Sequence, residues 1–380
     1  MKKSVLKVTS ILLLFIASNN FANYKPITEE EEEDKDQTIK VALLLDTSSS
    51  MDGLIHQAKA QLWEIVNELS YAKYGIKKPN LEIALYEYGN SNLNSEEGYI
   101  KQVLQFSNDL DEISEKLFSL TTSGGSEFCG QVIQTSLDEL SWGKNKHDLR
   151  LIFIAGNEPF TQGKINYKDA ITNAKEKDIV INTIFCGDFR NGVSGMWQDG
   201  AVSGGGDYMT INHNKKIVHV ITPYDDEILI LNKKLNKTYI YYGNTGYSKY
   251  QNQKKQDDNA ETLNEVVVVK RAVSKSSRLY DNATWDLVDA DKKQKVDYTK
   301  IEKQKLPKEL QNKSVAEIKS YVKKQSKERE AIQQKIKNLD TKRRSYIAKQ
   351  QQQESSKKNE LNSAIIKAIK RQAKLKNYSW

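Results

Sequence analysis

The chain has 380 residues, and its 58 lysines and arginines outnumber its 50 aspartates and glutamates, which gives a formal net charge of +8. This length is enough for one sizeable domain with an appendage, or for two domains. The basic excess is concentrated in residues 301–380, where few aromatic side chains are available to stack on bases, so we exclude nucleic acid as the partner.

The N-terminus has the pattern of a secretory signal peptide. Lys2 and Lys3 carry positive charge ahead of the apolar run 11–17, and small residues follow as far as Ala22. We predict that residues 1–22 are cleaved off and that the mature protein is secreted or periplasmic. The apolar run is short for a membrane span, and no cysteine follows it to accept a lipid. An uncleaved membrane anchor is the alternative.

An acidic segment separates this leader from the first predicted strand. Residues 29–34 are all glutamate or aspartate, a block of like charges that repel one another and have no apolar surface to bury. We therefore expect residues 23–37 to be a solvated acidic linker.

The most informative motif joins a buried strand to a helix. The apolar run 41–45 shows no polar alternation, which is typical of a central parallel strand, and it leads into Asp46, Ser48 and Ser50. Apolar residues then recur at helical spacing over residues 54–69. Ligands of open α/β sheets bind at the carboxyl ends of such strands. Because the three side chains offer oxygen donors, the motif favours a hard cation such as Mg²⁺ over zinc or copper.

Strands and helices alternate along residues 38–245. After the first strand and helix, we expect strands at 81–88, 99–106, 149–155, 179–186 and 207–212, and helices at 110–120, up to Trp142, at 167–177 and at 222–236. This alternation predicts an α/β fold with a doubly wound, mostly parallel sheet in which 99–106 is an edge strand.

The chain changes character beyond residue 245. We interpret 246–305 as a linker and packing segment, because 251–264 is polar and rich in lysine whereas 266–290 has apolar residues that are expected to pack back on the domain. Residues 306–380 have the pattern of a basic helical tail.

The tail carries a heptad pattern with polar interruptions. Apolar side chains occupy the two seam positions of one heptad frame at Val315, Ile318, Val322, Ile332, Ile336, Leu339 and Tyr346. The same frame puts Gln325, Arg329 and Arg343 on the seam. We predict a partly coiled-coil tail that forms a helical hairpin or a dimer seam, and so a means of self-association. Its lysine-rich face is expected to dock on an anionic envelope surface or an acidic partner, or else only to keep the protein soluble.

The two cysteines, Cys129 and Cys186, are expected at the same end of the sheet. In an oxidising compartment such a pair favours a disulfide, and two buried free thiols are the alternative. The sequence leaves both open.

The Asp46-x-Ser48-x-Ser50 motif, with the strand before it and the helix after it, resembles the opening of a von Willebrand factor type A (VWA) domain. In that family the motif begins the metal-ion-dependent adhesion site. The resemblance implies that a threonine from a second loop and an aspartate after the fourth strand complete the ligand set. Gly124-Gly125-Ser126-x-x-x-Gly130 resembles the second loop, with Ser126 in the place of the threonine. Thr122 is the alternative, and both can instead be helix caps.

The third element departs from the family pattern. The position of the aspartate falls on Gly156 or, with a slip of one residue, on Asn157, so that Asn157 or Glu158 has to serve instead, directly or through a water. The predicted metal ligands are Asp46, Ser48, Ser50, Ser126, Asn157 and Glu158. Mg²⁺ is the expected ion, with Ca²⁺ and Mn²⁺ as alternatives. The rival is a degenerate site in which Asp46 only caps the helix.

The expected function is that of an extracytoplasmic binding module. In the VWA family an aspartate or glutamate of a partner protein completes the coordination of the cation, which implies divalent-dependent adhesion or assembly. The alternative is a structural assembly protein that acts through its basic helical tail and has a vestigial metal site. No histidine lies in a His-Glu-x-x-His zinc motif or near an obvious nucleophile, so we do not expect an enzyme.

Overall fold

The computed structural model describes residues 37–212, 220–353 and 361–380. The predicted signal peptide, and all but the last residue of the predicted acidic linker, lie outside these residues. Within the described ranges no helix has the length and apolar character that crossing a membrane requires.

The described residues contain a central six-stranded sheet with the strand order β4-β3-β1-β5-β6-β7. The edge strand β4 is antiparallel to β3, and all other neighbours are parallel. The bounds are β1 (Thr38–Asp46), β3 (Asn80–Tyr88), β4 (Ile100–Ser107), β5 (Leu149–Gly156), β6 (Val180–Cys186) and β7 (Gly205–Ile211). The predicted doubly wound, mostly parallel sheet is confirmed.

The apolar runs of β1 and β5 lie in the middle of the sheet, where both faces are covered. Along β1, Val41 and Leu45 belong to one apolar core, while Ala42 and Leu44 belong to the core on the opposite face. Every residue of β5 is buried. A strand with no solvated face has no reason to alternate apolar with polar residues, which explains the unbroken runs in the sequence.

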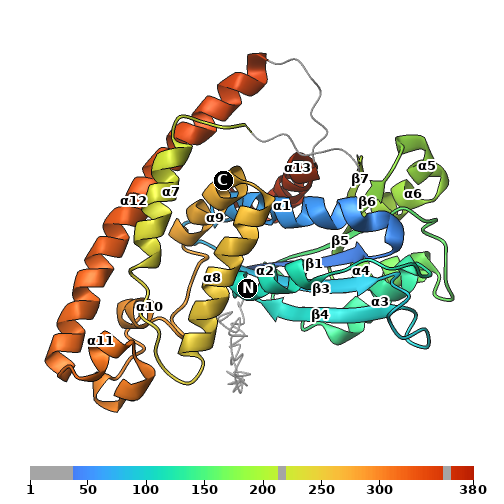
Figure 1. Ribbon diagram of the computed structural model, residues 1–380. Helices are drawn as coiled ribbons and strands as arrows, with labels where there is room; N and C mark the ends of the chain where they lie inside the picture. The colour runs from blue at the N-terminus through green and yellow to red at the C-terminus, as the bar shows by residue number, and fades with distance from the viewer. Residues whose placement is uncertain (1–36, 213–219, 354–360) are drawn as a thin grey trace, which may run out of the picture. The chain divides into compact units, whose positions relative to one another are not determined.

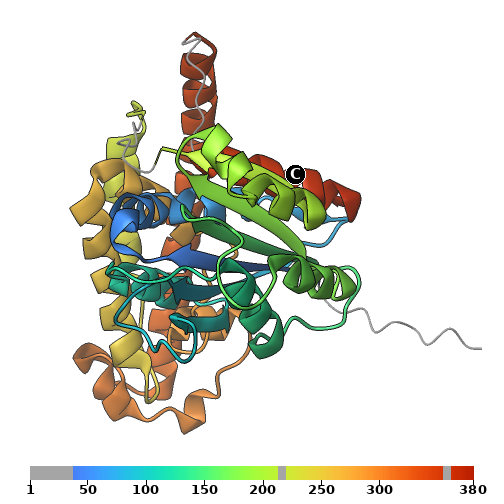
Figure 2. The same cartoon turned by 90° about the vertical axis from the view of Figure 1, so that its right-hand side faces the viewer.

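Helices cover both faces of the sheet (Figures 1 and 2). α1 and α2 contribute to the first core, and α3, α4 and α6 contribute to the second. The bounds are α1 (Asp52–Leu69), α2 (Leu110–Ser119), α3 (Cys129–Glu139), α4 (Tyr167–Glu176), α5 (Phe189–Ser194) and α6 (Trp197–Ser203), and a 3₁₀ turn, η1 (Ser49–Met51), precedes α1.

Cys129 and Cys186 are buried free thiols. Cys129 lies at the start of α3 in the second core, whereas Cys186 ends β6 and belongs to the first core. The two side chains therefore lie on opposite faces of the sheet. Of the two options that the sequence leaves open, the structure has the free thiols.

The polar segment 251–264, expected to be a linker or a surface loop, instead lies in helix α8 (Gly246–Leu263) except for its last residue, which caps the next helix. The buried face of α8 is polar: Gln256 Oε1 accepts a hydrogen bond from Ser114 Oγ at 2.9 Å, and Asp257 pairs with Arg271 at 2.5 Å. Because polar groups bury each other here, the apolar periodicity that indicates a helix is missing. The next helix, α9 (Glu265–Ser276), is buried along almost its whole length and packs against α1.

The remaining elements are mostly helical. They are α7 (Asp225–Asn236), α10 (Leu287–Lys292), α11 (Lys308–Gln311), α12 (Val315–Gln353) and α13 (Leu361–Leu375), with the 3₁₀ turns η2 (Tyr298–Lys300) and η3 (Lys303–Lys305). A second small sheet pairs β2 (Lys73–Tyr74) with β8 (Tyr378–Ser379) in antiparallel fashion. Next to it, Trp380 Nε1 donates a hydrogen bond to the carbonyl oxygen of Glu68, at the end of α1, at 3.0 Å.

The heptad seam of α12 is buried against helices of the same chain. α12 packs along α7, as Figure 1 shows, and also contacts α9 and α10. The seam residues Ile318, Val322, Ile332, Ile336 and Leu339 are all buried. The prediction that these positions form the seam of a helical hairpin or of a dimer is therefore wrong. The helices α7, α9 and α10 of the same chain already cover them.

The polar seam positions make specific ion pairs. Arg329 Nη1 lies 2.5 Å from Asp286 and 2.7 Å from Asp289 at the start of α10, and Arg343 Nε lies 3.0 Å from Asp225 at the start of α7. Asp225 also accepts hydrogen bonds from the backbone N and the hydroxyl of Thr222, at 3.0 and 2.6 Å. The interruptions of the heptad pattern therefore fix α12 to α10 and α7.

A buried ionic cluster joins the later helices to the sheet domain. Arg271 is fully buried and pairs with Asp111 of α2 at 2.8 Å and with Asp257 of α8 at 2.5 Å. Lys275, also fully buried, lies 2.9 Å from Asp257. Burial by itself would raise the pKa of Asp257, but Lys275 and Arg271 outweigh burial and hold this pKa below its usual value.

We expect Asp257→Asn to lower the free energy of unfolding at pH 7 by about 3–5 kcal/mol, because it leaves Lys275 and Arg271 buried without their carboxylate. A lowered pKa stabilises the fold above the unfolded value of about 3.9 and loses this effect as the pH falls toward the folded value. The gap in unfolding free energy between the wild type and the variant should therefore narrow steadily in urea unfolding as the pH falls from 4 to 2. Glu176→Gln, at an exposed carboxylate of α4, is the control, and a gap that does not depend on pH would contradict the prediction.

Candidate functional site

The candidate site lies where the order of the strands reverses. The chain proceeds from β1 to β3 and β4 on one side, and then crosses to β5, β6 and β7 on the other. The carboxyl ends of β1 and β5 are neighbours at this point, and they carry Asp46 and Gly156. Such a reversal leaves a crevice at the edge of the sheet, which is the usual position of a ligand in this kind of fold.

Asp46 is fully buried at the end of β1. Its Oδ1 accepts a hydrogen bond from the backbone N of Ser48 at 2.7 Å, within the turn. Its Oδ2 is buried and has no hydrogen-bond partner in the described part of the chain. Helix α1 begins at Asp52, and its cap residue Met51 makes no side-chain cap bond, so Asp46 is not the cap of this helix.

The structure brings three more of the predicted residues to this carboxylate or next to it. The hydroxyls of Ser48 and Ser50 lie 3.2 Å apart, and Asn157 Nδ2 donates a hydrogen bond to Ser50 Oγ at 3.1 Å. Asn157 Oδ1 is buried, and no described group donates a hydrogen bond to it. Carboxylate, hydroxyl and amide oxygens from β1 and from the end of β5 are thus collected in one place.

The other predicted residues lie at the margin. Ser126 is exposed, and it makes no hydrogen bond to another residue in the ranges 37–212, 220–353 and 361–380. The hydroxyl of Thr122 donates to Asp52 rather than to the site. Glu158 is exposed and accepts a hydrogen bond from Gln162 at 3.1 Å, although its charge still acts on the buried carboxylate of Asp46.

Glu127 is the residue that the sequence analysis missed. It follows Ser126 directly and is only 5% exposed, and its Oε2 is buried without a hydrogen-bond partner among the described groups. Gly89, after β3, shows how close it lies to Asp46. A Cβ atom on Gly89 would be 2.7 Å from Glu127 Cγ and 2.8 Å from Asp46 Oδ1. Both carboxyl side chains therefore pack over the backbone of Gly89.

The space that an aspartate side chain at Gly156 would need is occupied by neighbouring side chains. A Cβ atom on Gly156 would lie 2.6 Å from the hydroxyl of Tyr88, 3.1 Å from the ring of Trp197 and 3.2 Å from Asp46 Oδ2. Trp197 is completely buried, and the Tyr88 hydroxyl donates to the carbonyl oxygen of Ala155 at 2.9 Å. These groups leave no room for a carboxylate at Gly156, and the second acid of the site comes from the loop that carries Glu127.

The pKa values of both carboxyl groups lie above their usual range. The pKa of Asp46 is raised to about 6, mainly by burial and in small part by the charge of Glu158, while hydrogen bonds with Glu127 and Ser48 oppose the rise. Burial, together with the neighbouring Asp46, raises the pKa of Glu127 to about 9. Two carboxyl groups so close in a buried site need a proton or a cation between them.

The donor set fits a hard divalent cation. It consists of carboxylate, hydroxyl and amide oxygens, and three of the oxygens are buried without a hydrogen-bond partner in the described residues, on Asp46, Glu127 and Asn157. The described side chains contain no group of three or more histidines, cysteines or acids that could hold a metal. A cation at this site therefore depends on the serine hydroxyls and the asparagine as well as on the two acids.

A family model identifies this part of the chain. Residues 40–193 match the model of the von Willebrand factor type A domain. These residues form a VWA domain. VWA domains commonly mediate protein binding and are generally not enzymes. No curated protein sequence matches the chain.

Several solved structures resemble the VWA domain. One is proximal thread matrix protein 1 from the mussel byssus, with 13% identity and a TM-score of 0.35 over 47% of this chain and 43% of that chain. Another is a von Willebrand factor type A structure from Catenulispora acidiphila, with 11% identity and a TM-score of 0.35 over 46% and 39%. A third is an aerotolerance-related membrane protein from Bacteroides fragilis, with 17% identity and a TM-score of 0.31 over 46% and 93%. The chain thus spans less than half the length of the first two, and likenesses this weak carry no information on function.

Gly89 offers a direct test of the packing in the site. Gly89 and Gly243 have nearly the same positive φ, 75° and 74°, but nothing lies within 4 Å of a Cβ atom on Gly243. An alanine at either position bears the cost of the left-handed backbone, and only Gly89→Ala also collides with Asp46 and Glu127. We expect Gly89→Ala to be less stable than Gly243→Ala by about 1–3 kcal/mol in urea unfolding. Equal losses would show that the two carboxyl groups do not pack over Gly89.

Proposed function

We propose that this protein is an extracytoplasmic protein-binding module whose VWA domain holds a divalent cation and binds a partner protein through an acidic side chain. The observation that carries the proposal is the pair of buried carboxylate oxygens on Asp46 and Glu127, neither of which has a hydrogen-bond partner among the described residues. A buried charge without a partner is costly, and a cation is the partner that an oxygen-only site favours.

Asp46 and Glu127 would be the charged ligands, with the hydroxyls of Ser48 and Ser50 beside them. Asn157 would add its amide oxygen, and the exposed Glu158 and Ser126 would act at the rim or through water, since Mg²⁺ keeps several waters. Glu127 restores the negative charge that the family's aspartate would have supplied. The expected ion is Mg²⁺, with Mn²⁺ and Ca²⁺ as alternatives that share its preference for oxygen.

The bound cation would present positive charge to a carboxylate of the partner. Residues at the same edge of the sheet, after β6 and after β5, favour a protein partner rather than a small ligand. Phe189, at the start of α5, is 51% exposed, and its ring packs on Tyr208 with the centroids 5.2 Å apart. With the exposed Arg190 and Glu158, it offers aromatic and charged contacts, which are common at protein interfaces. The extracytoplasmic location rests on the signal-peptide pattern of residues 1–22.

The cation proposal is tested with Asp46→Ala and Glu127→Gln. We expect Mg²⁺, Mn²⁺ or Ca²⁺ to raise the melting temperature of the wild type relative to EDTA, because an ion that binds only the folded state stabilises it. Each variant should weaken binding of the ion in calorimetric titration by about tenfold or more, which corresponds to about 1.4 kcal/mol.

Glu127→Gln keeps the shape of the side chain, so a loss of binding in this variant is not a loss of folding. Glu97→Gln, at an exposed carboxylate on a neighbouring loop, is the control and should bind like the wild type. If both site variants keep the full stabilisation by the ion, there is no cation site between Asp46 and Glu127. If only Glu127→Gln keeps it, Glu127 is not a ligand.

A second candidate function is docking through the tail. The solvent side of α12 carries exposed lysines over four-fifths of its length, with only Glu317, Glu328 and Glu330 as exposed acids against them. The exposed lysines are Lys319, Lys323, Lys324, Lys327, Lys335, Lys337, Lys342 and Lys349. A face with this charge would attract an anionic envelope surface or an acidic partner.

Replacing Lys323, Lys324 and Lys327 together by glutamine should reduce binding to vesicles that contain anionic phospholipid. At about 1 kcal/mol for each lysine near such a surface, the partition coefficient falls by about a hundredfold at low salt. The control replaces Lys164, Lys168 and Lys175, which are exposed near α4 and change the net charge by the same amount. Equal losses in the two triple variants, or no binding by the wild type, would contradict docking through α12.

A further inference from the structure

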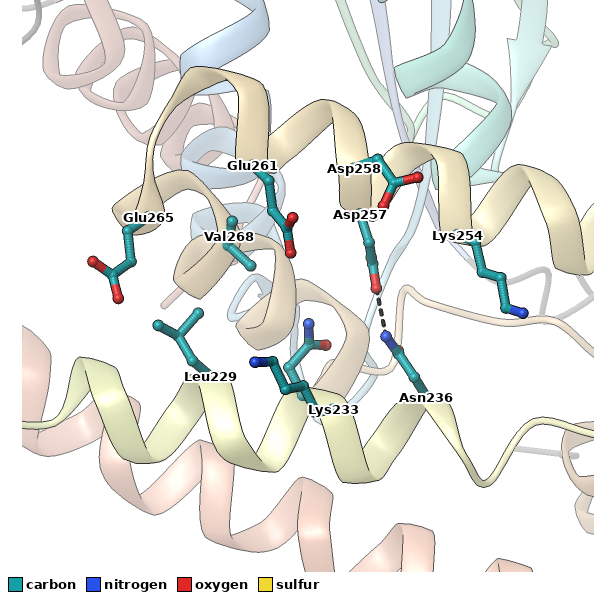
Figure 3. A pocket seen from close by; sticks show the side chains of 10 residues that line it. Leu229, Lys233, Asn236, Lys254, Asp257, Asp258, Glu261, Glu265 and Val268 are labelled. Carbon is teal, nitrogen blue, oxygen red and sulfur yellow. Dashed lines mark hydrogen bonds between the residues drawn. The ribbon is translucent and has the colours of Figure 1, made fainter.

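A pocket of about 460 Å³ lies between α7, α8 and α9 (Figure 3). None of its residues belongs to the candidate cation site, and all of them follow the family match over residues 40–193. On one side, Asn236 Nδ2 of α7 donates a hydrogen bond to Asp257 Oδ2 of α8 at 2.7 Å, the contact drawn as a dashed line in Figure 3. The pocket is thus built by the helices that the chain adds after its VWA domain.

The charge on the pocket wall is mostly negative and mostly unpaired. Asp257 already pairs with Lys275 and Arg271. The other carboxyl side chains on the wall have no ion pair within the described residues, and they are Asp258, Glu261 and Glu265. The wall also carries two positive charges, on Lys233 and Lys254, against these three negative ones. Lys254 Nζ lies over the ring of Tyr250, 4.4 Å from its centroid. One negative charge is left over, so the pocket favours a cation.

A second observation independently points to a hydrogen-bond donor. Asn232 of α7 lines the pocket and is only 5% exposed, and its Oδ1 has no hydrogen-bond partner in the part of the chain that the structure describes. The large majority of buried side-chain polar atoms in proteins have such a partner. A carbonyl oxygen can only accept, so the missing partner has to donate an N–H or an O–H.

The pocket also has an apolar side. Leu229 of α7 and the buried Val268 of α9 are among its lining residues. In Figure 3, Leu229 of α7 and Glu261 of α8 both project into the space between these helices. A carboxylate, an amide oxygen and two aliphatic side chains in one pocket match a cationic head on a methylene stem.

We propose that this pocket binds an alkylammonium group. The ammonium donates to Asn232 Oδ1 and lies within the field of Glu261 and Glu265, while its methylene stem contacts Leu229 and Val268. The same chemistry is offered by a free alkyl diamine and by a lysine side chain of a partner protein. The aliphatic side chains of Leu229 and Val268 favour an ammonium group on a methylene stem over a bare metal ion. An anion is disfavoured by the excess of carboxylates.

Lys233 allows the charge of the ligand to be tested. It projects from the same helix as Asn232 and lines the same pocket, so its charge repels an ammonium group. Lys233→Gln should therefore tighten the binding of a cation several-fold. An amino acid or another zwitterion would lose a partner for its carboxylate instead, and its binding would weaken.

The experiment is calorimetric titration of the full chain in EDTA, which keeps the result independent of the cation site. The probes are 1,5-diaminopentane and a capped peptide with one internal lysine, and the control peptide has norleucine in its place. Saturable binding of either ammonium probe, without binding of the norleucine peptide, supports the proposal. Binding of the diamine alone identifies a free amine as the ligand, and binding of the peptide alone identifies a protein side chain. Binding of neither probe overturns the proposal.

The variants locate the binding. Glu261→Gln should weaken it about tenfold, and Asn232→Ala should weaken it as well. Glu227→Gln, at an exposed acid of α7 outside the pocket, should leave it unchanged. If Asn232→Ala does not fold, the exposed Glu261 still decides the result. An unchanged affinity in Glu261→Gln, or weaker binding in Lys233→Gln, overturns the proposal.

Discussion

The carboxylate of Asp46 is the constraint around which this end of the sheet is built. It is fully buried, and one of its oxygens has no hydrogen-bond partner in the described chain. The groups around it are arranged to leave it room. Gly89 and Gly156 have no side chain where a Cβ atom would lie 2.8 or 3.2 Å from its oxygens. The fold therefore keeps an ionisable group in a place where burial disfavours its charge, which is a common mark of a functional position.

The part of the site that the sequence predicts is the part that is local in sequence. Asp46, Ser48 and Ser50 share one turn after a strand whose apolar run is unmistakable, and Asn157 follows the other central strand. Glu127 was not predictable in this way, because its neighbour Asp46 is distant in the chain and the contact forms only where the loop folds over Gly89. The signal was present all the same. Glu127 is the only acid in the loop over residues 121–128, and the aspartate expected at Gly156 was missing.

Among the later helices, the periodicity of apolar residues predicted which side chains are buried, but it did not predict which elements cover them. The heptad frame of α12 selects the buried face correctly from Ile318 to Leu339, yet that face packs on the same chain. Arg329 and Arg343 looked like defects in a coiled coil, whereas they form ion pairs with Asp286 and Asp225. Helix α8 escaped prediction for the related reason that its buried side chains are polar. Hydrophobic patterns do not register a helix that is fixed by charge.

The last residues of the chain pack against the core of the VWA domain, and this determines which part of the chain folds as a unit. The core that contains Leu45 and Trp63 of the VWA domain also contains Val267, Ile336 and Ile369, and Trp380 packs against it. The segment that matches the family is therefore shorter than the segment that shares one core. Cutting the chain at the edge of the family match would open this core instead of releasing a finished domain.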